Sequence, residues 1–479
     1  MHLQLDGLGP LHAQLTRALK TALAHGRGGQ GSRLPPTRAL ARELGISRNT
    51  VLTSYEQLRA EGFLEARTGS GSFVAMPLLA EAANDPMPMV APPQTAYARR
   101  AREVHDPAWV ARRRDPGIRH SFQYGLPLVN PALTTAWARE LARAAAYTPP
   151  GYPDAQGLPA LREAICDYLA RRRGVRATPD DVLVVGGTQQ AVSLAARVLV
   201  EPGDLVVVDE PQYFALRQVL QIHGARIHGA ECDADGLRPD RLPAEAPRLA
   251  CVTPSHQFPS GAVMSLARRL ELLQYARRQD AWILEDDYDG EFRYDSKPLA
   301  ALRSLDRDGR VLYVGTFSKS LFPSLRLGYV VMPPALRRDL VTAKWAQDFG
   351  SSAIEQAALA HFMHSGAFER HLRRSTRTLQ ERRAALLEGL HACSDGRLEI
   401  ADSHAGMHLV VWLRGKRDDE LDAVLAHAQR LGVGLHSIRP HYLRRPERAG
   451  LLMGYCGMSV AQIREAMPLF AQVLDAAYR

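Results

Sequence analysis

The sequence predicts an α/β protein with more than one domain, a short helical head followed by a large body built on a parallel sheet. The chain has 479 residues, which is too many for one compact core. From about residue 120 onward, short apolar runs rich in β-branched residues alternate with helical patterns. The first 75 residues instead hold a dense run of helical signals that ends in a glycine-rich hairpin.

The composition is that of an ordinary soluble globular protein, with 46% hydrophobic residues and no apolar run long enough to span a bilayer. The first residues lack the basic stretch and apolar core of a signal peptide, so we expect a cytoplasmic protein. Five scattered cysteines without a C-x-x-C pair fit thiols in a reducing compartment. The formal net charge of +9 permits a polyanionic partner without requiring one.

The head is expected over residues 1–75, and it contains two amphipathic helices separated by Gly45, the pattern of a helix-turn-helix corner. Thr37 is placed to cap the first helix and Ser47 to cap the second. The first turn of the second helix, where a recognition helix contacts base edges, holds Arg48, Asn49 and Thr50. The hairpin over 63–74 is expected to form a wing. Periodicity alone also allows a helical corner that binds no DNA.

A linker is expected over residues 76–119, because MPLLAEAANDPMPMVAPPQ is rich in alanine and proline. The basic stretch that follows it is expected to be partly helical. A solvated face is the first interpretation of that charge, and contact with a DNA backbone is the second.

The body is expected over residues 120–479. Its strand-like runs are short and apolar and have helical patterns between them, as in a buried parallel sheet. They cover residues 181–187, 204–210, 248–254, 281–287 and 310–316.

The stretch TFSKSLFPSLRLGY (316–329) follows the last of these runs and surrounds Lys319 with hydroxyl groups. A lysine amine forms a Schiff base with the aldehyde of pyridoxal 5'-phosphate (PLP). Hydroxyls and a forked guanidinium hold phosphate, which suits Thr316, Ser318 and Arg326. The sequence therefore predicts a PLP site with Lys319 at its centre.

Three other segments supply what such a site needs. Gly186 to Gln190 join a strand to a helix, whose first N–H groups can hold a phosphate. Tyr213 follows the next strand and is placed to stack on the pyridine ring, or to be an ordinary core aromatic. Asp286 and Asp287 end a strand and point to opposite sides, so we choose Asp286 for the ring nitrogen and Tyr288, on the same side, for the phenolic oxygen. A solvated acidic turn is the alternative for that segment.

The head, SRLPPTRALARELGISRNTV followed by YEQLRAEGFLEARTGSGSFV, closely resembles the winged helix-turn-helix of the GntR superfamily of bacterial regulators. The body resembles the fold-type-I aminotransferases, and TPSHQFPSG (253–261) together with the head resembles the MocR/GabR subfamily of GntR-like regulators. This resemblance implies double-stranded operator DNA as a partner and a domain-swapped, head-to-tail homodimer. It implies DNA contacts from Arg38, Ser47, Arg48, Asn49, Thr50 and, in the wing, Gly69, with Arg33 a weaker candidate.

The resemblance also implies PLP as cofactor, bound at Lys319 as an internal aldimine. It assigns Asp286 to the ring nitrogen, Tyr288 to the phenolate and Tyr213 to stacking. The implied phosphate contacts are Gly187, Thr188, Gln189, Thr316, Ser318 and Arg326.

Two departures from the aminotransferase pattern concern the effector side of the site. Phe258 to Gly261 replace the usual Asn-Pro-x-Gly turn, so His256 is considered as a substitute for the missing asparagine. LLMGYC (451–456) lacks the arginine that usually grips a substrate carboxylate, and Arg439 is considered in its place. Phe214 follows Tyr213 where a sensor of γ-aminobutyrate would want a basic residue, which argues against that ligand.

The leading hypothesis is a transcriptional regulator whose PLP-binding body senses PLP itself, an amino acid or another small amine. The alternative is an active PLP-dependent aminotransferase with a vestigial head. A third interpretation treats the body only as a dimerisation platform. His404 and His408 are spaced by four, but no third ligand is evident, so no metal site is expected.

Overall fold

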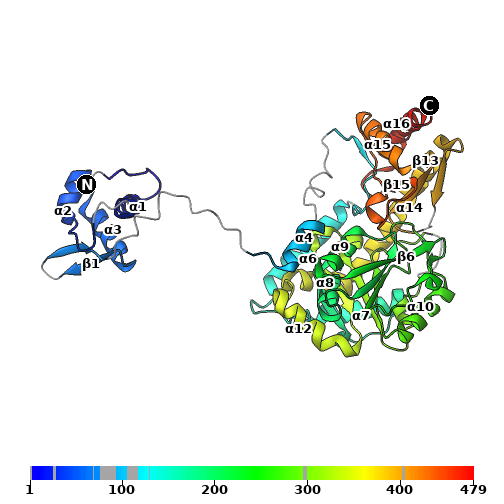
Figure 1. Cartoon of the computed structure of the whole chain (residues 1–479), viewed down its shortest axis with the longest axis horizontal. Helices are drawn as coiled ribbons and strands as arrows, with labels where there is room; N and C mark the ends of the chain where they lie inside the picture. Colours follow the sequence, from blue (N-terminus) through cyan, green and yellow to red (C-terminus); the bar gives the residue numbers. More distant parts are fainter. Residues whose placement is uncertain are drawn as a thin grey trace. The chain divides into compact units, whose positions relative to one another are not determined.

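The computed structural model divides the chain into two compact units, Met1–Pro93 and Gln94–Arg479 (Figure 1). It describes residues 3–24, 29–67, 70–75, 93–104, 117–128, 130–294, 299–401 and 405–479. Gly69 of the expected wing and His404 lie outside the described residues.

The head is a small three-helix unit with a hairpin. Its elements are α1 (Leu11–Ala24), α2 (Thr37–Leu44), α3 (Arg48–Ala60), β1 (Leu64–Arg67) and β2 (Gly71–Val74). Gly45 ends α2 in the left-handed region at φ 68°, which turns the chain into α3. The Ser47 hydroxyl caps α3 by accepting the Thr50 N–H at 3.1 Å, whereas Pro36, and not Thr37, occupies the capping position of α2.

The apolar faces of the three helices meet in one core, in which Leu15, Leu40, Val51 and Leu58 are buried. β1 and β2 pair antiparallel and so form the expected hairpin. Helix α1, which was not part of the predicted pair, packs against α3 and completes this core.

The body is built on an eight-stranded sheet in the described residues, with strand order β4-β11-β10-β9-β8-β5-β6-β7. Its strands are β4 (Val182–Val185), β5 (Leu205–Glu210), β6 (Arg226–Asp233), β7 (Gly236–Leu237), β8 (Leu249–Val252), β9 (Trp282–Asp287), β10 (Val311–Thr316) and β11 (Gly328–Val331). The five predicted runs are confirmed as β4, β5, β8, β9 and β10. Strands β6, β5, β8, β9 and β10 run parallel, and β11 is antiparallel to both β10 and β4.

Helices cover both faces of this sheet, because each central strand is apolar on both sides. In β4, Val182 and Val184 belong to one core cluster, and Leu183 and Val185 belong to another. The helices around the sheet are α6 (Pro131–Tyr147), α7 (Pro159–Arg173), α8 (Thr188–Leu199), α9 (Phe214–His223), α10 (Leu266–Arg278), α11 (Phe317–Ser320), α12 (Arg337–Asp348) and α13 (Ala353–His364). This layering is the expected α/β architecture.

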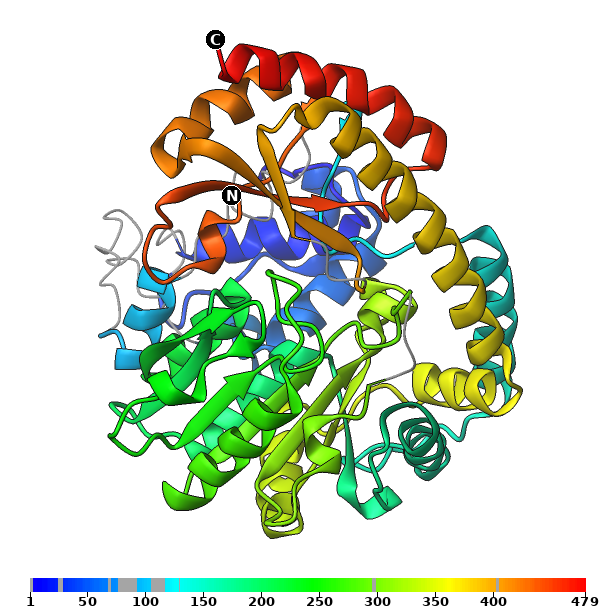
Figure 2. The ribbon, with the colours of Figure 1, turned by 90° about the vertical axis from the view of Figure 1, so that its right-hand side faces the viewer.

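A smaller C-terminal part holds a three-stranded antiparallel sheet of β12 (Leu398–Ala401), β13 (His408–Arg417) and β15 (Arg448–Gly454). Its helices are α15 (Leu421–Arg430) and α16 (Val460–Ala477), and β3 (His120–Ser121) pairs with β14 (Val433–Gly434). The long helix α14 (Ala367–Ser394), gold in Figure 2, runs from α13 to this part and packs on α16.

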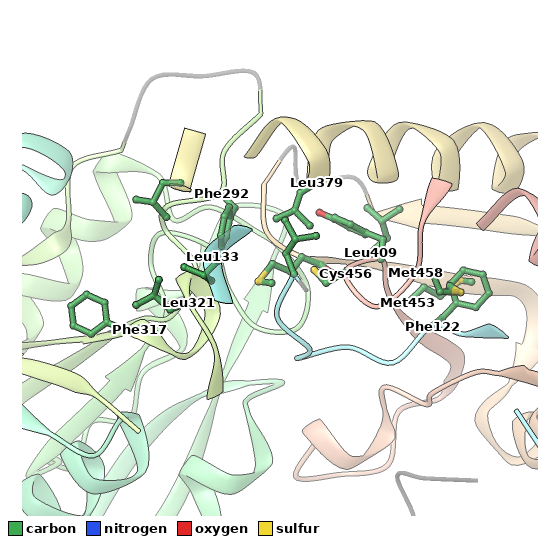
Figure 3. Packing of buried hydrophobic residues seen from close by; sticks show 14 of the residues in the cluster. Phe122, Leu133, Phe292, Phe317, Leu321, Leu379, Leu409, Met453, Cys456 and Met458 are labelled. Atoms are coloured by element: carbon green, nitrogen blue, oxygen red, sulfur yellow. Dashed lines mark hydrogen bonds between the residues drawn. The ribbon is translucent and has the colours of Figure 1, made fainter. Parts of the chain in front are cut away.

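One apolar cluster joins the two parts of the body. Figure 3 shows Phe317 and Leu321, which follow the large sheet, in the same cluster as Leu409 and Met453 of the small sheet. Each fully buried side chain of this size contributes about 1.5–3 kcal/mol. The two parts of the body therefore form one packed unit.

Part of the segment expected to be a linker is a helix, α4 (Ala96–Val104), that packs on α9. The Arg100 Nε donates to the Ile222 carbonyl at 2.9 Å, and the Gln218 amide donates to the Val104 carbonyl at 2.8 Å. The ring of Tyr97 meets the ring of His223 edge-on at 5.6 Å. Within the described part of the chain, no helix has the length and apolar character needed to cross a membrane.

Candidate functional site

A cavity of about 420 Å³ lies where the ends of β9 and β10 meet the start of α8. This volume falls in the range of small-molecule sites, roughly 300–1,000 Å³. Nine residues predicted from the sequence line it together: Thr188, Gln189, Tyr213, Asp286, Tyr288, Thr316, Ser318, Lys319 and Arg326. Gly187, the tenth, adjoins the cavity next to the Arg326 guanidinium.

Lys319 enters the cavity from α11, the single turn that follows β10. The Thr316 hydroxyl caps this turn by accepting the Ser318 N–H at 3.2 Å. The Lys319 Nζ donates to the carbonyl of Gly125 at 2.9 Å. Gly125 has φ 76°, a backbone conformation that favours glycine, and so brings its carbonyl to the amine.

The end of the cavity at α8 is suited to a phosphate. Gly187 precedes α8 at φ 99°, which leaves the first N–H groups of the helix directed at the cavity. The guanidinium of Arg326 lies beside Gly187, since a Cβ there would be 3.4 Å from the Arg326 Nη1. Helix dipole, guanidinium and the hydroxyls of Thr316 and Ser318 therefore converge on one anion-binding end.

Asp286 lies deep in the cavity and is 5% exposed. Its Oδ1 has no hydrogen-bond partner among the described residues. The pKa of this carboxyl is raised to about 7, chiefly by burial and then by the charges of Asp287 and Asp289, while Lys319 and a hydrogen bond from Thr188 partly offset the shift. The unpartnered Oδ1 fits a protonated ring nitrogen, because that nitrogen would donate the missing hydrogen bond.

The next residue, Asp287, points away from the cavity, as the alternation of a strand requires. Its carboxylate forms a buried ion pair with Arg173 at 2.6 Å and accepts a hydrogen bond from the Tyr313 hydroxyl. The two adjacent carboxyls thus have different surroundings, one paired with an arginine and one facing the cavity.

Tyr288 faces the cavity on the same side as Asp286, and burial raises the pKa of its phenol well above the usual range. The His256 Nδ1 lies 2.9 Å from the Tyr288 hydroxyl and 2.9 Å from Asp289 Oδ2. His256 therefore positions the Tyr288 hydroxyl through this contact. Of the two residues, Tyr288 is the one that lines the cavity. Phe258, the residue that replaces the asparagine of the aminotransferase turn, lines the cavity itself.

Tyr213 precedes α9 as its capping residue and lines the cavity. Its ring packs perpendicular to that of Phe258, at 5.8 Å and 89°. This position agrees with a ring that covers the cofactor, although Tyr213 also packs against the sheet-helix core.

The structure does not support Arg439 as an effector contact. Its Nε donates to Asp418 at 2.7 Å and its Nη1 donates to Asp422 at 3.1 Å, and Arg439 is not among the described residues that line the cavity. Two carboxylates thus already satisfy this guanidinium within the small C-terminal part.

Residues from distant segments complete the cavity, and local patterns gave no sign of them. They are Tyr124, Gly125, Leu126, Thr253, Met407 and His408. Burial and the neighbouring His256 lower the pKa of His408 to about 4, so this imidazole is neutral near pH 7. Its Nε2 donates to the Pro259 carbonyl at 3.0 Å.

The head presents the expected DNA-binding side chains at one end of α3. Arg48 and Asn49 are exposed in its first turn, and Arg38 is exposed on α2. Ser47 and Thr50 hydrogen-bond each other through their hydroxyls at 2.8 Å, so Ser47 also serves as a cap. In the hairpin, Arg33 lies over Gly71, where a Cβ would be 3.2 Å from its Nε.

Comparison with known proteins supports both predicted parts of the chain, the head and the body. Residues 11–74 match the family "Bacterial regulatory proteins, gntR family", and residues 127–467 match "Aminotransferase class I and II". The chain is 38% identical to the "Probable rhizopine catabolism regulatory protein MocR" of Rhizobium meliloti, over 97% of this chain and 94% of that protein. It is 32% identical to the pyridoxine biosynthesis transcriptional regulator PdxR of Corynebacterium glutamicum, over 83% and 82%.

Among solved structures, the chain resembles the multiple substrate aminotransferase of Thermococcus profundus, with a TM-score of 0.72 and 25% identity over 80% of this chain and 98% of that one. A GntR head joined to an aminotransferase-like body defines a PLP-dependent, DNA-binding transcriptional regulator. The chain belongs to the MocR/GabR subfamily of these GntR-type regulators.

Proposed function

We propose that Lys319 holds PLP covalently and that the loaded cavity senses PLP itself or a small amine and thereby changes operator binding. One observation carries this proposal: a lysine and a buried carboxyl with one unpartnered oxygen, Asp286 Oδ1, face the same cavity in a chain that also has a DNA-binding head. When bound, PLP supplies an aldehyde that reacts with amines and a ring that withdraws electrons.

The lining residues have separate tasks in this proposal. Asp286 accepts a hydrogen bond from the ring nitrogen, Tyr288 donates to the phenolic oxygen, and Tyr213 covers the ring. The phosphate is held by Gly187, Thr188, Gln189, Thr316, Ser318 and Arg326. The fit is supported by the anion-binding character of the α8 start and by the Asp286 Oδ1, which has no hydrogen-bond partner among the described residues.

Helix α9 extends from the cavity to helix α4, which follows the segment that connects the head to the body. Tyr213 caps its first turn at the cavity, and its last turn carries His223, which packs on α4. A helix of 10 residues spans about 15 Å and moves as a stiff element. Residues 76–95 join α4 to the head along the chain, so a shift of Tyr213 would reach the connecting segment through α9 and α4. The coupling requires that the two arrangements differ in affinity for the effector.

Replacing Arg100 by alanine is expected to weaken this coupling. The substitution removes the hydrogen bond to Ile222 and the packing of the guanidinium on Gly224. The change in DNA affinity caused by PLP should decrease, while PLP affinity and PLP-free DNA affinity stay within about twofold of wild type. Fluorescence anisotropy of labelled upstream DNA, with and without PLP at fixed salt, measures the DNA affinities. An absorbance titration measures the PLP affinity.

Arg99→Ala is the matched control, because Arg99 is an exposed arginine on the same helix. An unchanged PLP response in Arg100→Ala, or an equal loss in both variants, would show that α4 docking does not carry the signal.

Replacing Arg48 by alanine is expected to weaken operator binding roughly 5- to 150-fold, since a bidentate base contact contributes about 1–3 kcal/mol. The loss should be smaller for non-specific DNA. Arg59→Ala, at the opposite end of α3, is the control, and anisotropy at fixed salt is the measurement. Equal losses on operator and non-specific DNA would assign Arg48 to the backbone instead of a base edge.

We further propose that the protein acts in the cytoplasm as a homodimer with a head-to-tail, domain-swapped arrangement. Exposed aromatic side chains support association of the body: Tyr147 is 81% exposed, Tyr152 88% and Trp345 52%. The ring of Phe349 contacts that of Tyr152 at 5.1 Å and that of Trp345 at 5.6 Å, so these three rings form one surface patch. Light scattering of the purified protein, with and without PLP, tests the oligomeric state.

A further inference from the structure

The positive charges among the described cavity-lining residues are both committed to the cofactor. Arg326 lies beside Gly187 at the anion-binding end, and Lys319 is the residue proposed to attach PLP. The remaining titratable imidazole on the cavity wall, His408, is neutral near pH 7 because burial lowers its pKa to about 4. Among the described residues of the wall, no cationic side chain is thus left to pair with an effector carboxylate.

The wall beyond Lys319 is aromatic and apolar. Tyr124 and Phe258 line it, with ring centroids 6.1 Å apart, and Met407 and Leu126 extend it. Leu452 of β15 packs behind Tyr124 and Phe258 and is fully buried. His441, which is also fully buried, packs against both rings, and its Nε2 lies 3.1 Å from the Tyr124 hydroxyl.

Such a wall should bind a ligand without a carboxylate more tightly than the same ligand with one. An ionised carboxylate that loses its hydration without gaining a cation or several N–H donors carries a large cost in free energy. An apolar or aromatic body gains free energy in proportion to the area it buries there. The wall therefore selects against α-amino acids and in favour of the corresponding amines.

We propose that the effector of this cavity is a primary amine that lacks a carboxylate and has an apolar or aromatic body in contact with Tyr124, Phe258 and Met407. This proposal rests on the proposed function, because the amino group must meet PLP near Lys319. It also agrees with the lack of an arginine in residues 451–456.

The test uses the full chain loaded with PLP and pairs of ligands that differ only in the carboxylate: phenethylamine with L-phenylalanine, tyramine with L-tyrosine, and isoamylamine with L-leucine. Two quantities are followed, the absorbance of the bound cofactor and the affinity for upstream DNA. At least one amine should change both at a concentration at least roughly tenfold below that of its amino acid.

Met407→Arg should reverse the preference by supplying a cation at the wall, and Met407→Leu should leave it unchanged because it conserves volume. The thermal transition of both variants, measured with PLP, verifies that they are folded. The comparison of amines with amino acids on the wild-type protein tests the proposal even if Met407→Arg does not fold.

Amino acids acting at the same concentration as their amines, or lower, would overturn this inference, as would the absence of any response to all three amines. In both cases a response of DNA binding to PLP alone would leave the proposed sensor function intact. If PLP itself neither binds at Lys319 nor alters DNA affinity, the sensor function fails, and the effector inference fails with it.

Discussion

Lys319→Ala is expected to abolish covalent attachment of PLP and, with it, the effect of PLP on operator binding. The Nζ of Lys319 is the amine that enters the cavity, and alanine offers no nucleophile to the cofactor aldehyde. Binding of PLP-free protein to DNA should stay within about twofold of wild type, because the substitution lies in the body and the base contacts lie in the head.

Absorbance after PLP addition, together with borohydride reduction and peptide mapping, measures attachment at Lys319. Lys319→Arg is the matched control, since arginine keeps the positive charge but does not condense with an aldehyde. Loss of the DNA response in both variants would assign it to the covalent bond. A response that persists in Lys319→Ala would mean that non-covalent PLP, or another ligand, drives the switch.

Asp286→Asn is expected to have two opposite effects, weaker PLP binding and a more stable PLP-free protein. The amide cannot accept a charge-assisted hydrogen bond, which is worth about 1.5–3 kcal/mol, so PLP affinity should fall roughly 10- to 150-fold. In the PLP-free protein the same change removes a buried carboxyl whose Oδ1 has no partner among the described residues.

The gain in stability should depend on pH. Burial raises the pKa of Asp286 to about 7 in the folded protein, against about 3.9 when unfolded. The unfolded state therefore releases this proton first, and the carboxyl lowers stability progressively as pH rises from about 4 to about 7. The difference in Tm between Asp286→Asn and wild type, without PLP, should thus grow from pH 5 to pH 8.

Asp287→Asn provides the contrast at the neighbouring position. It breaks a buried ion pair with Arg173 whose side chains are 4% and 3% exposed, which costs about 3–5 kcal/mol. Differential scanning fluorimetry of the three proteins across this pH range measures both effects. If Asp286→Asn destabilised the PLP-free protein as much as Asp287→Asn, the cavity-facing carboxyl would be structural.

Features that depend on residues close together in the chain could be predicted from the sequence alone. Five strands of the large sheet, β4, β5, β8, β9 and β10, follow from short apolar runs rich in β-branched residues, because a strand buried on both faces is largely apolar. The opposite directions of Asp286 and Asp287 follow from the two-residue period of a strand. The start of α3 follows from the ability of Ser47 to accept an N–H of the first turn.

Contacts between distant segments were decided only by the tertiary structure. The approach of Tyr124 and Gly125 to Lys319, nearly 200 positions away in the chain, depends on how the small C-terminal part and the sheet pack together. Arg439 appeared available in the sequence, but the fold places Asp418 and Asp422 around it.

The docking of α4 on α9 could not be predicted from the sequence either. Nothing within a few residues of Arg100 specifies Ile222 as its partner. The sequence by itself thus determined the two domain types, five strands of the large sheet and the presence of Lys319 in the cavity. The tertiary structure alone decided which walls enclose that site, because a local pattern reports neighbours a few residues apart, whereas a cavity is formed by segments that only packing brings together.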